Sequence, residues 1–221
     1  MGAAIGDILG MAVGVAISPV PVIAVILMLF SSRASANSLS FLAGWVTGLA
    51  AAGLIVLALG VEASTAGEAN GGGVIKIVIG ALFVVLGIRQ WSLRPRGDEG
   101  PEMPGWMATI DDFNAAKSFG LAFLLSAVNP KNLGLTIAAV ASIGASGLET
   151  GEEIGTLAVF VVLASLTVAV PVIVNLVLGS KAEQGLTEMK DWLVTNNNTV
   201  MAVLFVVLGA KVLGDGIASV A

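Results

Sequence analysis

Six long apolar segments are the feature that most constrains the fold of this chain. They lie at about residues 5–31, 39–61, 74–92, 118–146, 153–179 and 199–219. A helix rises about 1.5 Å per residue, so each segment is long enough to cross roughly 30 Å of hydrocarbon. Only 11% of the 221 residues are charged, against about 25% in an ordinary soluble domain. The sequence therefore predicts an all-α membrane protein with six transmembrane helices.

The two halves of the sequence resemble each other, which indicates a duplication. A Leu-Phe-Val-Val-Leu-Gly run closes each half, within Ala81 to Gly87 and within Val203 to Gly209. The first segment of each half also has a helix-capping residue followed by proline near its middle, Ser18-Pro19 and Asn129-Pro130. An odd number of spans per repeat places the halves in opposite orientations. We therefore expect two inverted three-helix repeats.

The longest connection, residues 93–117, separates the two repeats. It is rich in proline and charge and predicts a polar linker. Its second part, Trp106 to Phe113, has apolar residues at helical spacing, which fits either a short interfacial helix or a capped loop turn. The predicted organisation is a first repeat at 1–92, the linker at 93–117 and a second repeat at 118–221.

Basic residues are distributed unevenly between the two sides of this topology. Seven of the ten Lys and Arg residues fall on one side: Arg33, Arg89, Arg94, Arg96, Lys117, Lys181 and Lys190. Lys76 and Lys211 fall on the other side. Basic loops favour the cytoplasm, so we expect a multi-pass protein of the cytoplasmic membrane with both termini non-cytoplasmic. If the first segment of each half were a re-entrant hairpin instead, the bias would weaken to six against three.

The residue types that are missing exclude several functions. Cysteine and histidine are both absent, which excludes disulfides, thiolate metal sites and imidazole bases. No nucleophile–base pair and no phosphate-binding glycine loop is visible, so we expect no enzymatic activity, no cofactor and no metal. The net charge of −5 lies in the loops and gives no indication of nucleic-acid binding. The N-terminus lacks a basic stretch, so we expect no cleavable signal peptide.

The prolines inside the first and fourth segments predict helix breaks within the membrane. Ser and Asn are favoured N-caps, and Pro is favoured at the first helical position, so a second half-helix is expected to start at each. Such N-termini attract anions, and two of them would converge near the midplane. The expected substrate site comprises Ser18, Pro19, Pro21, Asn129, Pro130, Lys131 and Asn132. The alternative is a pair of proline kinks that only shape packing.

Lys131 is the only basic residue in the middle of a predicted span. An ammonium there costs at least about 2.5 kcal/mol, which favours a role as anion contact or coupling charge over a lysine that snorkels to the interface. Its candidate charge partners are Asp7 and Asp215, which also fit simple interfacial caps. Because burial is costly, replacing Lys131 by Met is expected to leave stability equal or higher.

Other polar and small residues have less specific interpretations. Asn175 follows Pro171 in the fifth segment and either lines the substrate path or makes a helix–helix hydrogen bond. Two small-residue rows are spaced for close helix contact, Gly6, Gly10, Gly14 and Gly44, Gly48, Ala52. A homodimer would bury more of these faces.

The run Asn129 to Leu133 resembles the lysine-exporter (LysE) superfamily, and within it the chain is most similar to the lipid-addressing (GAP/Sap) family. The similarity covers essentially the whole chain and includes Ser18 to Pro21, Arg33, Gly44-Trp45 and Trp106 to Phe113. It implies an exporter that contacts membrane lipids and moves an envelope glycolipid or another small molecule outward. The alternative is a scaffold or accessory subunit of a larger lipid exporter.

Two other transport chemistries fit the sequence poorly. The lack of cysteine excludes the thiol-disulfide carriers that share this superfamily architecture. A divalent-cation exporter would need several oxygen ligands converging in the bundle, whereas a lysine occupies the second predicted break.

Overall fold

The computed structural model describes residues 1–60, 71–95 and 105–220, which are almost wholly helical and contain no strand. The first half comprises α1 (Gly2–Ala16), α2 (Pro19–Leu29), α3 (Ala34–Ala58) and α4 (Gly71–Ser92). The 3-10 helix η2 (Gly105–Asp112) follows. The second half comprises α5 (Ala115–Phe123), the π-helix η3 (Leu124–Val128), α6 (Pro130–Gly144), α7 (Thr150–Leu178), the 3-10 helix η4 (Gly179–Ala182) and α8 (Glu183–Val220). The all-α prediction is confirmed.

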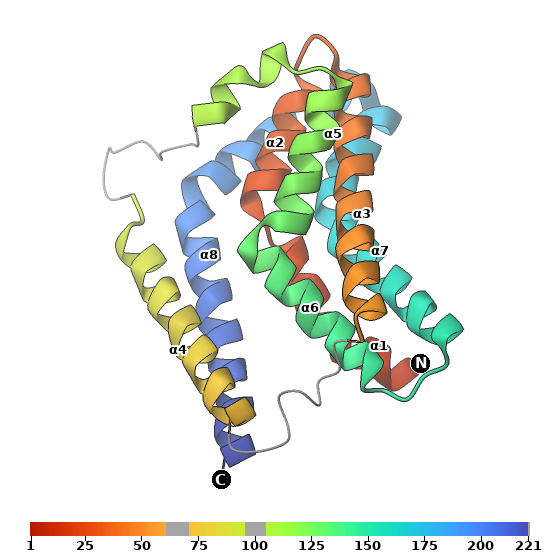
Figure 1. Cartoon of the computed structure of the whole chain (residues 1–221). Coiled ribbons are helices and arrows are strands. Elements are labelled where there is room, and N and C mark those ends of the chain that lie inside the picture. Colours follow the sequence, from red (N-terminus) through yellow and green to blue (C-terminus); the bar gives the residue numbers. More distant parts are fainter. Residues whose placement is uncertain (61–70, 96–104, 221) are drawn as a thin grey trace.

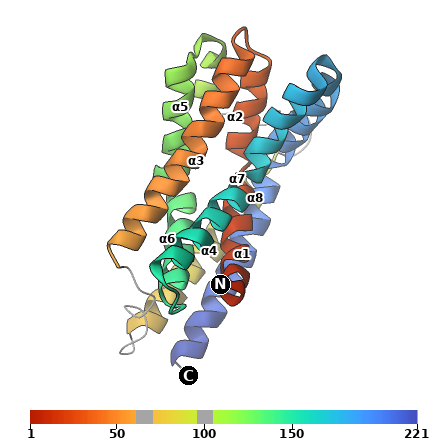
Figure 2. The ribbon, with the colours of Figure 1, turned by 90° about the vertical axis from the view of Figure 1, so that its right-hand side faces the viewer.

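Both predicted helix breaks are present. α1 and α2 meet at an angle of 55°, and the segment Ala115–Val128 meets α6 at 58°. In Figure 1 each pair continues along the long axis of the molecule across its bend, and consecutive long segments run in opposite directions. The N-terminus and the end of α8 consequently lie at the same end of the molecule (Figures 1 and 2).

Several helices are apolar enough to cross a membrane. Among the described residues, the stretches Ala34–Ala58 and Thr150–Ala218 qualify alone, and the count rises to four if each bent pair is one span. Ile77–Ser92 of α4 is a shorter apolar helix. Figure 2 shows that the long stretch is two antiparallel helices, because the chain reverses at η4 between α7 and α8. These helices identify a membrane protein.

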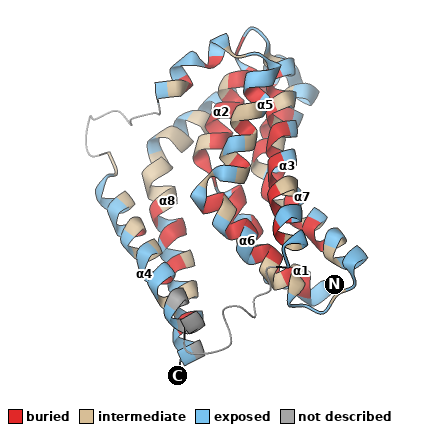
Figure 3. Cartoon of the chain, in the orientation of Figure 1, coloured by how far each residue is buried: buried red, intermediate tan, exposed pale blue. Residues whose placement is uncertain are grey.

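The centre of the fold is α2 (Figure 3). Nine of its 11 residues are buried. A helix that is apolar on all sides is covered either by other helices or by lipid, and here other helices cover it. Helices α3, α7 and α8 contact it. Of the two alternatives for Trp106 to Phe113, the structure has a short helix, η2, which packs on α2 with Met107 and Ile110 buried.

Glycines allow α3 to lie directly against the second half. A Cβ at Gly44 would collide with the backbone oxygen of Phe119, and one at Gly48 would collide with Ser126 Oγ. The close contact expected at Gly44 and Gly48 is therefore present. In the row on α1 the expectation holds for Gly14, where a Cβ would lie 3.0 Å from Leu135 Cδ1, and is wrong for Gly6 and Gly10, which are exposed and have no atom within 4 Å of an added Cβ.

Helices α4 and α8 form a separate antiparallel pair, also joined at glycines. A Cβ at Gly80 would lie 2.9 Å from Gly209 O, and one at Gly87 would lie 3.0 Å from Ala202 O. When the two Leu-Phe-Val-Val-Leu-Gly runs are aligned, Gly80 corresponds to Ala202 and Gly87 to Gly209, so these two contacts are equivalent. The contact of Gly87 with Val206 is equivalent in the same way to that of Gly209 with Val84. The repeated runs therefore pack on each other symmetrically.

Helix α8 begins well before the apolar segment expected at 199–219. Its first four turns are mostly polar but carry an apolar stripe that packs against the core: Leu186, Met189, Leu193 and Val194. Spacings of three and four residues place this stripe on one face. Hydropathy alone could not reveal it. Residues 96–104 of the predicted linker, which include Arg96, and the side chain of Lys76 lie outside the described residues.

Candidate functional site

The break between α1 and α2 follows from two prolines that lack an N–H group. In a continuous helix, residues 19 and 21 would donate to the carbonyl oxygens of Val15 and Ile17. The amide of Ser18 is also diverted, because it donates to Ala16 O at 2.8 Å instead of the oxygen of residue 14. The break therefore leaves carbonyl oxygens at the end of α1 that need other donors.

Lys131 supplies donors to two of these oxygens. Its Nζ donates to Gly14 O at 2.9 Å, to Ile17 O at 2.8 Å and to Ser18 Oγ at 2.6 Å. A lysine ammonium has three donors, so all three are used. The side chain is only 9% exposed, and it points into the protein rather than snorkelling outward. Its ammonium also faces the negative end of the α1 dipole.

The remaining oxygens are paired by hydroxyl groups. Ser18 Oγ donates to Val15 O at 2.7 Å, and Thr167 of α7 donates to Ala16 O at 2.6 Å. Ser18 occupies the N-cap position of α2, yet its side chain does not cap that helix. Its hydroxyl instead joins Lys131 to the end of α1.

The second break is organised by two asparagines. Asn129 Oδ1 accepts a hydrogen bond from the backbone N of Lys131 at 3.0 Å and so caps α6. The π-helical turn before it pairs Asn129 N with Leu124 O at 3.2 Å. With the same spacing of five residues, Leu125 O would accept from the backbone N–H of residue 130. Residue 130 is proline and has no N–H. Asn132 Nδ2 replaces it, donating to Leu125 O at 2.9 Å.

Both breaks line one cavity of about 360 Å³. It includes all seven residues expected to form the substrate site at the breaks: Ser18, Pro19, Pro21, Asn129, Pro130, Lys131 and Asn132. Gln90 from α4 and Asn197, Met201 and Phe205 from α8 line it too. The cavity therefore lies between the two breaks and the α4–α8 pair.

Three other predicted site residues lie outside this lining. Asn175 is half-buried on α7, and Asp7 is exposed on α1. Asp215 forms an ion pair with Lys211 at 2.9 Å. The partners that the structure gives to the Lys131 ammonium are all neutral oxygens.

Sequence analysis missed the polar residues contributed by α4 and α8. Asn197 is the most informative, because its Oδ1 is buried and has no hydrogen-bond partner among the described residues. The run Asn196 to Asn198, three amides just before the last apolar segment, was the available signal. The sequence signal for Gln90 was weaker, since this residue lies near the end of the third apolar segment, next to Arg89.

The cavity combines one buried cation with amide groups and apolar side chains. This set can bind a polar anionic group next to a hydrophobic one. No group of three or more Asp, Glu, Cys or His side chains that could hold a metal ion occurs in the part of the chain that the structure describes.

The fold and cavity define a helical membrane protein with a polar site between two broken helices. The chain belongs to the family described as Sap, sulfolipid-1-addressing protein, which it matches over residues 8–218. This match includes both breaks and the whole cavity lining. No curated protein and no solved structure matches the chain.

Proposed function

We propose that this protein transports an anionic envelope lipid or similar amphiphile out of the cytoplasmic membrane, with the headgroup bound in the cavity between the two breaks. The observation that carries this proposal is the ammonium of Lys131, which lies beside the cavity and whose hydrogen-bond partners in the described part of the chain are neutral oxygens. The family description names a sulfolipid, and a sulfolipid headgroup is anionic. We also propose that the protein binds this lipid without converting it chemically.

Electrostatics favour an anion at this position. A charge removed from water is poorly stabilised by carbonyl dipoles alone, and a nearby opposite charge acts strongly at low dielectric. The Oδ1 atom of Asn197 lacks a donor and can accept a hydrogen bond from a headgroup hydroxyl. Met201 and Phe205 provide apolar surface in the same cavity. The cavity thus suits a headgroup that is anionic, hydroxylated and attached to hydrocarbon.

We also propose that the chain spans the membrane six times as two inverted three-helix repeats. The symmetric glycine contacts of α4 and α8 support the repeat, as does the packing of α1 on α7 and of α5 on α3. The bends of 55° and 58° change direction without reversing it, which favours broken spans over re-entrant hairpins. Membership of the lysine-exporter superfamily, the domain boundaries and a homodimer remain predictions.

The orientation follows from where the basic segments lie. The α2–α3 connection, the end of α4, the start of α5 and η4 carry Arg33, Arg89, Arg94, Lys117 and Lys181. α4 ends nearer the middle of the molecule, and the α2–α3 connection, the start of α5 and the turn between α7 and α8 lie at the end opposite the two termini (Figure 1). We propose that this end faces the cytoplasm.

Purified protein in liposomes tests transport directly. A labelled acidic glycolipid should cross the bilayer in liposomes that contain this protein alone, and a zwitterionic lipid with the same chains should cross more slowly. Asn197→Ala should lower the rate for the glycolipid. Asn196→Ala is the matched control, since Asn196 bonds Trp192 O outside the cavity. Unchanged glycolipid distribution with wild-type protein would favour a non-transporting scaffold.

A further inference from the structure

We propose that the outer groove between α4 and α8 binds one anionic membrane lipid, with an acyl chain in the groove and the headgroup at Arg94. This site lies outside the central cavity and shares no lining residue with it. It goes beyond the transport function proposed above, because it concerns a lipid held on the outside of the protein.

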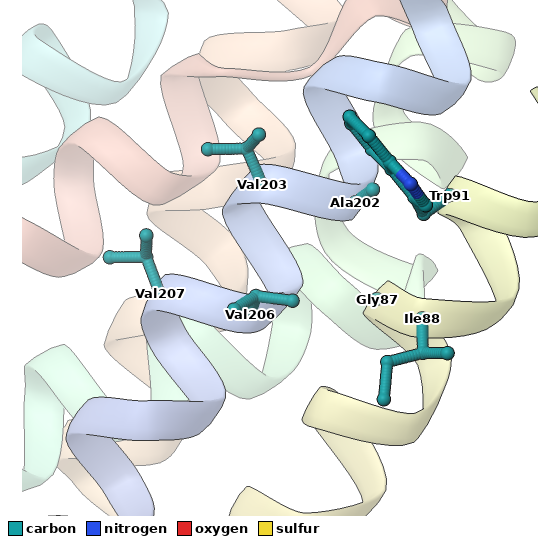
Figure 4. Close-up of a pocket in the computed structure, with 7 residues that line it drawn as sticks. All are labelled: Gly87, Ile88, Trp91, Ala202, Val203, Val206 and Val207. Carbon is teal, nitrogen blue, oxygen red and sulfur yellow. The ribbon is translucent and has the colours of Figure 1, made fainter.

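The groove has a lining suited to hydrocarbon. Its volume is about 260 Å³, and every residue that lines it is apolar. Figure 4 shows the Trp91 ring beside Ala202 at one end and Val207 toward the other. The side chains of Val203 and Val207 are 55% and 61% exposed, so the groove opens outward, where apolar helices of a membrane protein meet lipid.

The shape of the groove depends on Gly87. A Cβ at this position would lie 2.7 Å from Val206 Cγ2 and 3.0 Å from Ala202 O, so any side chain here would force α4 and α8 apart. The glycine lets the two helices approach closely while leaving a trough between Ile88 and Val207. A trough of this kind fits a single flexible acyl chain.

A cationic group with an unused donor lies at the tryptophan end of the groove. The guanidinium of Arg94 stacks on Trp91, with Cζ 3.9 Å from the ring centroid. Its Nη1 is buried and has no hydrogen-bond acceptor among the described residues. A buried donor without an acceptor is costly, and a phosphate, sulfate or carboxylate oxygen is the strongest acceptor available to arginine.

The position of Arg94 is fixed by its surroundings. Asn198 Nδ2 of α8 donates to Leu93 O at 2.6 Å, which holds the end of α4 on α8. Trp91 contributes to both parts of the site, because its ring lines the groove and also carries the guanidinium. Tryptophan and basic residues together are typical of the membrane interface, where anionic headgroups lie.

Quenching of tryptophan fluorescence by brominated acyl chains tests this site. The full-length protein in detergent micelles is titrated with phosphatidylglycerol or with phosphatidylcholine carrying the same dibrominated chains. We expect phosphatidylglycerol to quench at a lower mole fraction, and we expect Trp91→Phe to abolish that difference. Arg94→Gln should raise the mole fraction of phosphatidylglycerol needed by about tenfold. Arg94→Lys should have a smaller effect, because it keeps the charge and loses the planar fork.

Arg89→Gln is the matched control, because Arg89 is an exposed cation on the same helix that does not line the groove. It should quench like the parent protein. Equal quenching by the two lipids in the parent protein would overturn the proposal. So would an Arg89→Gln effect as large as that of Arg94→Gln, which would indicate attraction by general positive charge. Melting temperatures measured in the same micelles identify any variant that is misfolded.

Discussion

Lys131 donates a hydrogen bond of 2.8 Å to the carbonyl oxygen of Ile17, the oxygen that Pro21 leaves without its helical donor. This contact joins the second helix break to the first across more than half of the sequence. The proline removes a donor in one half, and a lysine from the other half replaces it. The two breaks are therefore one interdependent unit.

Replacing Lys131 by Met should lower stability. The sequence-based expectation of equal or higher stability considered only the cost of a buried charge. The structure adds three hydrogen bonds, and their loss leaves Gly14 O and Ile17 O unpaired, at about 1–3 kcal/mol for each buried group. Denaturant unfolding in micelles measures this, with the exposed Lys181→Met as control. A Lys131→Met protein as stable as the parent would show that the hydrogen bonds contribute little net stability.

Substitutions at Lys131 also distinguish the effect of its charge on transport from its effect on stability. Lys131→Arg keeps the positive charge, so we expect part of the transport of an acidic glycolipid to remain, whereas Lys131→Met should abolish it. Rates are compared per folded molecule, counted by size-exclusion chromatography. If the Met protein moved the acidic lipid at the parent rate, the central anion site would be disproved.

Pro21→Ala should straighten the break between α1 and α2. The restored N–H can pair with Ile17 O and compete with Lys131 for that oxygen. Spin labels at the exposed positions Gly10 and Phe30 report the angle, and the chain has no native cysteine to interfere. We expect the distance between labels to increase. Pro171→Ala, inside α7, is the control and should leave this distance unchanged, whereas an unchanged distance in Pro21→Ala would contradict the prediction.

Gly48→Ala and Gly10→Ala should change stability in opposite directions. Alanine at position 48 places a methyl group against Ser126 Oγ and 3.0 Å from Phe123 O, so it should separate α3 from α5 and destabilise the protein. Alanine at position 10 meets nothing within 4 Å and should stabilise α1 by about 0.5–1 kcal/mol. Thermal melts of both variants provide the test. Equal effects would show that the contact at Gly48 is unimportant.

Single cysteines test the orientation. Ser35 is exposed in the first turn of α3 and Glu149 is exposed just before α7, and these two helix starts lie at opposite ends of the molecule (Figure 1). We expect a membrane-impermeant thiol reagent added to intact cells to label a cysteine at 149 but not at 35. The reverse pattern would contradict the proposed orientation, and labelling of both would contradict the alternating topology.

The breaks could be predicted because their signals are local. A capping residue followed by proline identifies a helix start whatever surrounds it, and Ser18 and Asn129 both precede helices that start at the predicted proline. The partners of Lys131 could not be predicted, because they lie 113 to 117 residues away in sequence. Residue spacing alone identified a face of α1 and of α3, but not that Gly10 faces outward while Gly48 meets another helix.

The far wall of the cavity was unpredictable for the same reason. Gln90 and Asn197 belong to helices that meet only in the folded chain, and α8 needed its amphipathic first turns to bring Asn197 to the cavity. The charge partners were chosen by sign alone. Backbone oxygens freed by prolines carry no net charge, so the pattern of charged residues in the sequence gives no indication of them.

The arrangement of α4 and α8 has a mechanical consequence. α4 packs chiefly on α8, and the glycine contacts hold the two helices at close range. The pair provides one wall of the cavity, while the lysine network holds the opposite wall. The first turns of α8 are held on the core through Leu186 and Met189. A movement of α4 and the later turns of α8 relative to α2 would therefore change the width of the cavity, while the hydrogen bonds of Lys131 stay within the opposite wall.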